Sequence, residues 1–285
     1  VVLAVGISFY AVNHYQAMED NKARIALIEP GSKQAVLTLP DGSTIDVQKK
    51  DINVIVDGVQ VKYNKGVLSY RPTVTTQQHA EKNVDESPAK SNELVIPRGG
   101  ENTVLLADGT TVHLNAGSKL IYPARFVGKR RIVTLEGEAY FEIAENKKSP
   151  FLVLAENVKI QVTGTCFNVK AYASDKVIKT TLDEGSINIG HVQSRRPMQQ
   201  MLPGQTAVYE KRSNVIKIKT DRYHDDASSW KSNRLIFRNA SLKEVLTILS
   251  RHFDIEITVK NEKIASFTYD FVCKGNDLNY VLEVM

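Results

Sequence analysis

The sequence predicts a mainly β protein: an elongated antiparallel β sandwich or solenoid-like domain, followed by a small α+β module of βαβ type. Three observations support this prediction. From Lys33 onward, apolar and polar residues alternate with a period of two, and turn-forming residues interrupt the alternation at short intervals. Helical spacing of apolar residues is scarce before Ser241. The composition, with 42% hydrophobic and 24% charged residues, is that of a globular chain and excludes a disordered or polytopic membrane protein.

The first element is an apolar run, Val1 to Val12, which is too short to cross a bilayer because a spanning helix needs about 20 apolar residues. It has the length of a signal-peptide core but lacks the basic residues before it and the small-residue cleavage site after it. A buried core helix is a second interpretation. The third, which we favour, is the end of a transmembrane helix with Tyr10 and Tyr15 at the membrane interface. Residues 1–30 are then that end and a juxtamembrane segment of a longer protein.

A repeated hairpin begins the β domain, which we place at residues 31–221. Asp41-Gly42 and Asp108-Gly109 lie at matching positions of two similar segments that alternate apolar and polar residues. Asp57-Gly58 lies in a third such segment. These pairs predict two-residue turns, because glycine, and tolerably aspartate, adopts the positive φ that such turns require.

Two polar stretches divide the chain. Residues 72–93 lack any apolar period and predict a long loop inside the β domain. The composition changes again at residues 221–233, where we predict a linker and a domain boundary. A smaller module follows at residues 234–285.

This module combines strand and helix signals. Leu235, Ile236 and Phe237 predict a short strand, after which Ser241 and Glu244 form a capping box that opens a helix. Ile255, Ile257 and Val259 alternate with polar residues and predict a second strand. Asp277 is placed to cap another helix, which stops within the element, so we expect the module to be truncated at its C-terminus.

The most prominent carboxylate group lies on one predicted strand and comprises Glu136, Glu138, Glu142 and Glu145. Glu136 and Glu138 are expected on one face about 6.6 Å apart, near the separation of the acids in inverting glycosidases. The apolar residues that alternate with the glutamates predict a buried face, so the glutamates are expected on its solvated side. Catalysis of glycoside hydrolysis by this group, through Glu138 and Glu142, is therefore the weakest hypothesis.

Other chemistry has little support in the sequence. The six histidines show no metal-ligand spacing, and the local candidate His224-Asp225-Asp226 lies in the predicted linker. Cys166 and Cys273 form no C-x-x-C motif and are expected to be separate buried thiols, although a disulfide between them stays open. Phosphate-binding and serine-nucleophile motifs are absent. We therefore predict no catalytic residue, no cofactor and no metal.

The positive charge is a weak argument for a nucleic-acid partner. The formal net charge of +5 is spread along the whole chain. The densest basic sites, Lys129-Arg130-Arg131 and Arg195-Arg196, flank strands without interleaved aromatic residues. We expect both to be solvated turns and predict no binding of nucleic acid.

Six motifs follow one another along the β domain: Ile96–Glu101, Leu105–Pro123, Leu135–Val153, Val162–Tyr172, Thr181–Ile189 and Leu202–Tyr209. In this order they resemble the FecR family of anti-sigma factors. The stretch Asn233–Val259 looks like the C-terminal module of larger FecR-like proteins, which is related to the secretin and TonB short N-terminal (STN) fold. The resemblance covers roughly residues 31–285.

The resemblance implies an inner-membrane, single-pass protein of a Gram-negative bacterium, with this region in the periplasm. Its partners are then the signalling domain of an outer-membrane TonB-dependent transporter and, through a cytosolic domain that this sequence lacks, a sigma factor. The family releases its sigma factor when the transporter signals, and the transported ligand is an iron chelate or a glycan.

A protein with that task needs a rigid scaffold and a surface for its partner, but no reaction chemistry. We expect the partner at a sheet edge formed by Leu235 to Phe237 or by Ile255, Ile257 and Val259, because main-chain hydrogen bonds at an edge give affinity. The alternative, that both strands are internal, stays open. A β-rich glycan-binding or adhesion module is the second hypothesis, and it requires Tyr122, Tyr140 and Tyr172 to be exposed along one groove.

Overall fold

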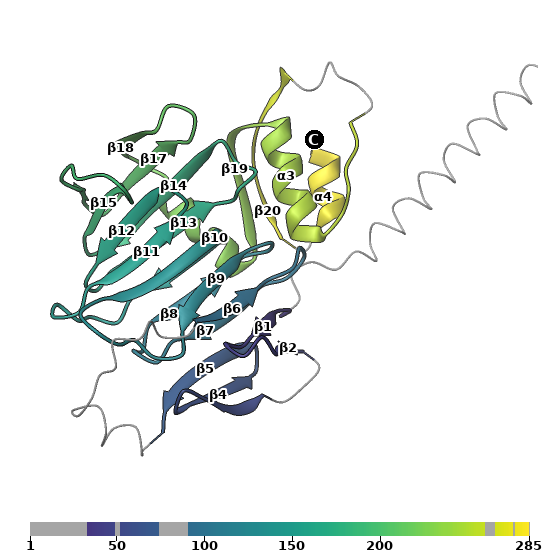
Figure 1. The fold of residues 1–285 in the computed structure, drawn as a ribbon. Coiled ribbons are helices and arrows are strands. Elements are labelled where there is room, and N and C mark those ends of the chain that lie inside the picture. The colour runs from purple at the N-terminus through teal and green to yellow at the C-terminus, as the bar shows by residue number, and fades with distance from the viewer. Residues whose placement is uncertain (1–32, 49–51, 74–90, 260–265, 276, 285) are drawn as a thin grey trace, which may run out of the picture. The chain divides into compact units, whose positions relative to one another are not determined.

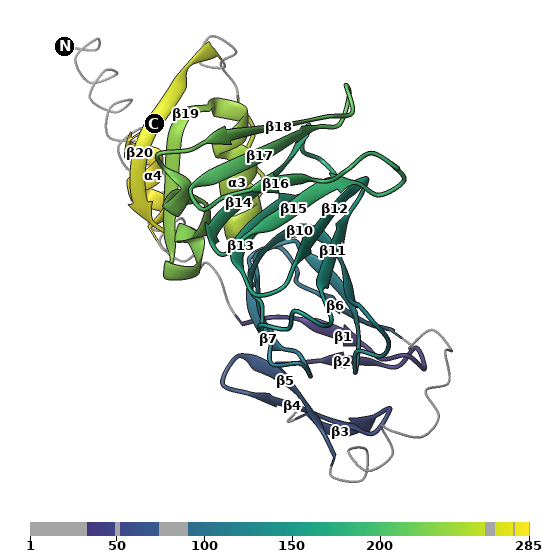
Figure 2. The ribbon, with the colours of Figure 1, turned by 90° about the vertical axis from the view of Figure 1, so that its left-hand side faces the viewer.

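The computed structural model describes residues 33–48, 52–73, 91–259, 266–275 and 277–284. They form two compact units, one ending at Ser232 and the other beginning at Asn233. The apolar run Val1–Val12 and most of the predicted loop 72–93 lie outside the described residues. Within the described ranges, no helix is long and apolar enough to cross a membrane. The structure is mainly β, as predicted (Figures 1 and 2).

The described part of the first unit, the β unit, contains eighteen strands and one 3-10 helix. They are β1 (Val36–Thr38), β2 (Thr44–Asp46), β3 (Asn53–Val56), β4 (Val59–Asn64), β5 (Val67–Pro72), β6 (Ser91–Val95), β7 (Asn102–Leu105), β8 (Thr111–Leu114), β9 (Lys119–Pro123), β10 (Arg131–Glu142), β11 (Phe151–Ala155), β12 (Val158–Val162), β13 (Cys166–Ala171), β14 (Val177–Glu184), β15 (Ile187–His191), β16 (Gln199–Met201), β17 (Gln205–Glu210), β18 (Val215–Thr220) and η1 (His224–Ser232). Because β5 ends at Pro72 and β6 begins at Ser91, the predicted loop was too long at both ends.

The strands form two hydrogen-bonded ladders that share β10. In sheet I the order is β2, β1, β6, β9, β10, β11, β12, β15, β16. In sheet II it is β3, β4, β5, β7, β8, β10, β13, β14, β17, β18. Neighbours are antiparallel except for β10–β11 and β5–β7, which run parallel. The predicted antiparallel architecture is therefore confirmed for most of the described pairs.

Strand β10 changes sheets at Gly137. Residues before it pair with β9 and β11, and residues after it pair with β8 and β13. Gly137 has φ +104°, and a Cβ atom at this position would lie 2.5 Å from Ser118 Oγ. The backbone N–H of Glu138 donates to that oxygen (2.8 Å). Only glycine combines this backbone conformation with so close an approach, so Gly137 is the corner that joins the two sheets.

The inner faces of the two sheets share one hydrophobic core. It is built from alternate strand positions, and its largest fully buried aromatic side chains are Tyr122, Tyr209, Phe141, Phe151 and Phe167. The rings of Phe141 and Phe167 stack with centroids 5.1 Å apart. The period-two pattern thus marks the inner face, as expected.

The repeated hairpin is present, but its turns differ from the prediction. In both copies the glycine N–H donates to the leucine C=O three residues earlier, Gly42 to Leu39 (2.9 Å) and Gly109 to Leu106 (3.0 Å). The glycines have φ +85° and +87°, whereas their aspartates do not have positive φ. These are three-residue loops, a turn followed by a left-handed glycine. The two-residue turn is confirmed only at Asp57-Gly58, where both φ values are positive.

The second unit, the C-terminal unit, contains β19 (Arg234–Ser241), α3 (Leu242–Phe253), β20 (Thr268–Lys274) and α4 (Leu278–Val284). Strands β19 and β20 pair antiparallel. The predicted capping box is confirmed, since Ser241 and Glu244 satisfy each other's backbone N–H groups. The predicted cap of the last helix is also confirmed, because the N–H of Tyr280 donates to Asp277 Oδ1 (2.9 Å).

Candidate functional site

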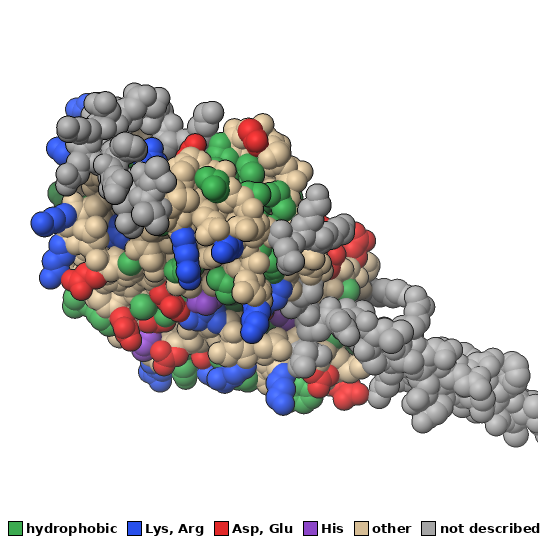
Figure 3. Space-filling model, turned by 90° about the horizontal axis from the view of Figure 1, so that it is seen from below, with side chains coloured by type: hydrophobic (Ala, Val, Ile, Leu, Met, Phe, Trp, Pro, Cys, Tyr) green, Lys and Arg blue, Asp and Glu red, His purple; other side chains and the backbone are tan. Residues whose placement is uncertain are grey.

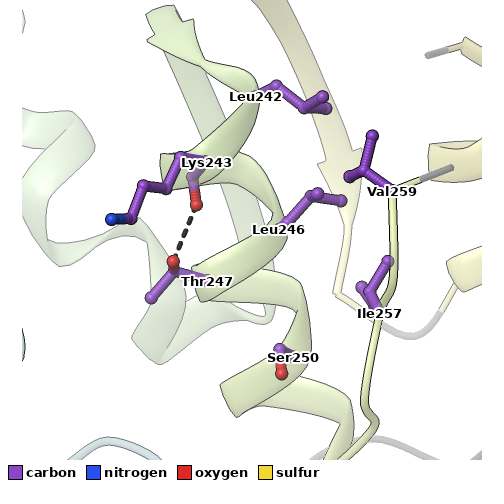
Figure 4. A pocket seen from close by; sticks show the side chains of 7 residues that line it. All are labelled: Leu242, Lys243, Leu246, Thr247, Ser250, Ile257 and Val259. Carbon is purple, nitrogen blue, oxygen red and sulfur yellow. Dashed lines mark hydrogen bonds between the residues drawn. The ribbon is translucent and has the colours of Figure 1, made fainter. Parts of the chain in front are cut away.

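An open groove runs along one side of α3 in the C-terminal unit (Figure 4). Its volume is about 400 Å³, and its lining residues are Leu242, Lys243, Leu246, Thr247, Ser250, Ile257 and Val259. The side chains of Leu242 and Leu246 extend from the helix toward Ile257 and Val259, while Lys243 and Thr247 lie on the other flank (Figure 4). The groove is therefore apolar along its floor and carries a cation at its rim.

The groove exists because the apolar face of α3 is broader than the part of it that packs in the core of the C-terminal unit. Val245, Leu249 and Phe253 are buried against β19 and β20. Leu246 is only half-buried, and its side chain extends toward Val259 (Figure 4). The helix ends at Asp254, which adopts a left-handed conformation (φ 50°) and turns the chain back along the helix. The returning segment is fixed at its start by the hydrogen bond from Ile255 N–H to the Ser250 carbonyl (3.1 Å).

The returning segment is the one we predicted as a second strand, and that prediction is wrong. Residues Ile255, Ile257 and Val259 lie in irregular structure after α3. The described ladder of this unit consists of β19 and β20 alone. The apolar residues of the segment alternate because Ile255 and Ile257 pack against the hydrophobic core, and not because the segment belongs to that ladder. Val259 is 36% exposed at the end of the groove.

The other predicted strand is present. Leu235, Ile236 and Phe237 lie on β19 and pair with Cys273, Val272 and Phe271 of β20. Leu235 and Phe237 are buried in the core, whereas Ile236 is half-buried on the opposite face. One core therefore contains residues of both segments: Leu235 and Phe237 of β19, and Ile255 and Ile257 of the returning segment. Of the two, only the returning segment lines the groove.

The sequence does not predict the groove. Leu242 and Leu246 fall at helical spacing with Val245 and Leu249, a pattern that indicates one apolar helix face. Leu242 is buried, whereas Leu246 is half-buried. A stripe of apolar residues this broad is a signal of a second contact face, but it does not say whether the chain itself covers that face.

The tyrosines needed for a glycan-binding groove are buried, which corrects the expectation that they are exposed. Tyr122 is 1%, Tyr140 7% and Tyr172 5% exposed. The Tyr172 hydroxyl donates to the Ala116 carbonyl (2.8 Å), and the Tyr122 hydroxyl is hydrogen-bonded to that of Tyr70 (2.9 Å). Rings used in this way cannot stack on a sugar.

The glutamates of β10 were expected on a solvated face, and this is wrong for Glu138. Its residue exposure is 8%, while the side chains of Glu136 on β10 and of Glu145, which follows β10, are 53% and 69% exposed. Glu138 accepts hydrogen bonds from Asn115 Nδ2 (2.9 Å) and Asn168 Nδ2 (3.1 Å). Asn168 in turn accepts from the indole N–H of Trp230 in η1 (3.2 Å). Part of this outer face is covered by η1, in the region predicted as linker, through Trp230 and Lys231.

A second polar group lies beside this one on the outer face of sheet II. Lys231 Nζ lies 3.2 Å from the centroid of the Tyr140 ring and 3.4 Å from Glu142 Oε1. Glu142 also contacts His113 Nε2 (3.3 Å), and the Tyr140 hydroxyl donates to Asp183 Oδ2 (2.9 Å). Burial lowers the pKa of His113, opposed by the charge of Glu142. Burial also raises the pKa values of Asp183 and Tyr140, because removal from water disfavours the charged form of each group.

This arrangement does not activate a nucleophile. Burial raises the pKa of the Cys166 thiol, so the reactive thiolate is disfavoured. Burial raises the pKa of Cys273 to about 11, and its Sγ donates to the Leu235 carbonyl. Both cysteines are free thiols, with Cys166 half-buried and Cys273 buried. Among the described residues, no group of three or more His, Cys, Asp or Glu side chains is close enough to hold a metal ion.

The basic sites also differ from one another. Arg195 and Arg196 are exposed, as expected. Arg131 is 2% exposed, which corrects its assignment to a solvated turn. Its guanidinium donates to Asp108 (2.7 Å) and so ties the repeated hairpin to β10. Basic and acidic side chains are interspersed on the face shown in Figure 3.

Comparisons with known proteins agree with the motif pattern. The family model described as FecR protein matches residues 92–188, and the model described as FecR, C-terminal matches residues 234–285. Together they span slightly more than half of the chain. No curated protein matches the chain.

Two crystal structures of a protein assigned as an anti-sigma factor from Parabacteroides distasonis ATCC 8503 are similar to the chain. The structure at 1.65 Å resolution has 27% sequence identity and a TM-score of 0.62, and the match covers 67% of this chain and 88% of that chain. The structure at 2.50 Å has the same identity and TM-score and covers 68% and 89%.

Proposed function

The chain belongs to the FecR family, and we propose that it is the periplasmic part of a membrane-bound anti-sigma factor. It relays a signal from an outer-membrane TonB-dependent transporter to a cytosolic sigma factor. The observation that carries this proposal is the agreement of two family models, in order, with solved structures assigned as an anti-sigma factor. In this proposal a cytosolic region binds the sigma factor, and a single membrane-spanning helix joins that region to the periplasmic part.

We place the transporter's signalling domain at the C-terminal unit, which we take to be STN-like. Two features of the described residues support this placement. The groove presents an apolar floor that includes Leu246, Ile257 and Val259. The part of the returning segment that lines it, Ile257 and Val259, lies outside the described β19–β20 ladder. An extended segment of the partner would lie along the groove, and its side chains would fill it.

Genetic context and transcription test the proposal together. We expect a sigma-factor gene and a transporter gene beside the gene of this protein. Deleting the gene of this protein is expected to change transcription from promoters that depend on that sigma factor. Deleting the transporter gene is expected to abolish the response of those promoters to the transported ligand. Unchanged transcription in both strains would contradict the proposal.

A variant pair locates the contact. Val259→Asp places a charge at the exposed end of the groove, where Val259 is 36% exposed, and Val215→Asp places one on β18 of the other unit, where Val215 is 42% exposed. The first variant is expected to abolish the ligand response, because an unpaired charge in an apolar contact is costly. The second is expected to retain it. A ligand response that survives Val259→Asp would remove the groove from the proposal without removing the relay.

A further inference from the structure

The 3-10 helix η1 lies on the outer face of sheet II and directly precedes the C-terminal unit. It contacts β14, and its residues Trp230 and Lys231 reach side chains of β10 and β13. Of its nine residues, only Trp230 is buried. A 3-10 helix of this length is unusual, because its hydrogen-bond geometry is poorer than that of an α-helix. Its position therefore depends on its anchors more than on its own backbone.

Two adjacent side chains at the end of η1 anchor it to β10 and β13. Trp230 is 9% exposed and donates its indole N–H to Asn168 Oδ1 (3.2 Å). Lys231 lies over the Tyr140 ring, with Nζ 3.2 Å from the centroid, and pairs with Glu142 (3.4 Å). A cation over an aromatic face and a hydrogen-bonded indole are specific contacts, and each can be removed without opening the inner core.

The surface beneath η1 is polar, unlike the inner face of the same strands. We define the polar bed as Glu138, Tyr140, Glu142, Asn168 and Asp183. Its members are already hydrogen-bonded to one another or to neighbouring strands, as Tyr140 is to Asp183 and Asn168 to Glu138. Asp183 Oδ1 is buried without a hydrogen-bond partner. Water reaching the bed would satisfy that oxygen, so uncovering the bed is less costly than uncovering an apolar core.

From these contacts we propose that η1 is a releasable strap that sets the length of the connection between the two units. With the strap docked, the connection between the fixed residues Lys231 and Arg234 spans roughly 10 Å when extended. With the strap released, the connection runs from Asp221 to Arg234 and spans roughly 45 Å when extended. Release lengthens the tether while the β unit stays folded. This inference does not rest on the proposed function.

Trp230 is the one tryptophan of the chain, so its fluorescence reports on the strap alone. In a denaturant titration of the full chain, we expect the emission to shift to longer wavelength before the β signal in far-ultraviolet circular dichroism is lost. Acrylamide is expected to quench the emission over the same early range. Coincidence of the two transitions would overturn the proposal, because the strap would then be an inseparable part of the β unit.

Two lysine variants separate release from general destabilisation. Lys231→Met removes the cation at the strap, and Lys217→Met removes an exposed lysine of the same unit that pairs with Glu210 (2.9 Å). Lys231→Met is expected to move the tryptophan transition to lower denaturant and leave the circular dichroism transition in place. It is also expected to increase the maximum dimension of the chain in small-angle scattering. Lys217→Met is expected to do neither. Equal displacement of both transitions in Lys231→Met, or release without a longer maximum dimension, would contradict the strap.

Discussion

Tyr140 and Phe141 are neighbours on β10 and lie on opposite faces of sheet II. Phe141 is fully buried in the hydrophobic core, where its ring stacks on that of Phe167. Tyr140 is almost as buried, but it lies in a polar layer under η1, between Lys231 and Asp183. Burial alone therefore does not distinguish the two faces. What separates them is the covering element: a second β sheet over the inner face and a short helix over the outer face.

The largest effect is expected on the inner face. Phe141→Ala removes a buried ring from the core and is expected to lower the free energy of unfolding by about 3–5 kcal/mol. Denaturant unfolding followed by circular dichroism measures this loss. A loss below about 1 kcal/mol would mean that the inner core is loosely packed and that the contrast with the outer face is wrong.

The next effect is expected where β10 passes from one sheet to the other. Gly137→Ala forces a side chain into a backbone with φ +104° and against Ser118. It is expected to cost about 1–3 kcal/mol, because both the conformation and the contact are unfavourable. Gly42→Ala is the matched control, since Gly42 also has positive φ but nothing lies within 4 Å of an added Cβ. Equal losses in the two variants would show that the contact with Ser118 is unimportant.

A smaller effect is expected on the outer face. Tyr140→Phe keeps the ring beneath Lys231 and removes the hydroxyl that donates to Asp183. The free energy of unfolding is expected to fall by about 1 kcal/mol, the usual net value of one hydrogen bond. A loss equal to that of Phe141→Ala would mean that both faces of β10 are equally part of the core.

The smallest effect concerns pH. Burial lowers the pKa of His113, so the folded state favours the neutral ring. The resulting stability is present above the unfolded pKa of about 6.5 and is lost as the pH falls through the lower folded pKa. We expect the wild-type protein to lose slightly more stability than His113→Gln between about pH 7.5 and 5.5. Identical losses in the two proteins would show that His113 is not buried as a neutral group.

Much of the inner architecture was accessible from the sequence, because alternation marks which side chains face a core. This holds for Leu120, Leu135 and Phe141, and the capping box at Ser241 was equally explicit. The outer face was not accessible, because polar residues such as Glu138 and Asn168 give the same pattern whether they face water or η1. Nothing in the composition of residues 221–233 signals that Trp230 is an anchor.

The candidate site shows the same limit. Ile255, Ile257 and Val259 alternate as a strand would, but alternation gives the face of a side chain and does not provide a pairing partner. Leu235 to Phe237 carry a similar pattern and do find a partner in β20. The difference lies in long-range pairing, which a local pattern does not encode. The groove is lined by part of that segment, so the local pattern does not predict the groove either.

Calorimetric titration of this chain with the purified signalling domain of the neighbouring transporter tests the central claim most directly. The proposed relay predicts binding with a dissociation constant of about 10 μM or tighter, lost in Val259→Asp and retained in Val215→Asp. Absence of binding by the wild-type chain at about 50 μM would contradict the relay.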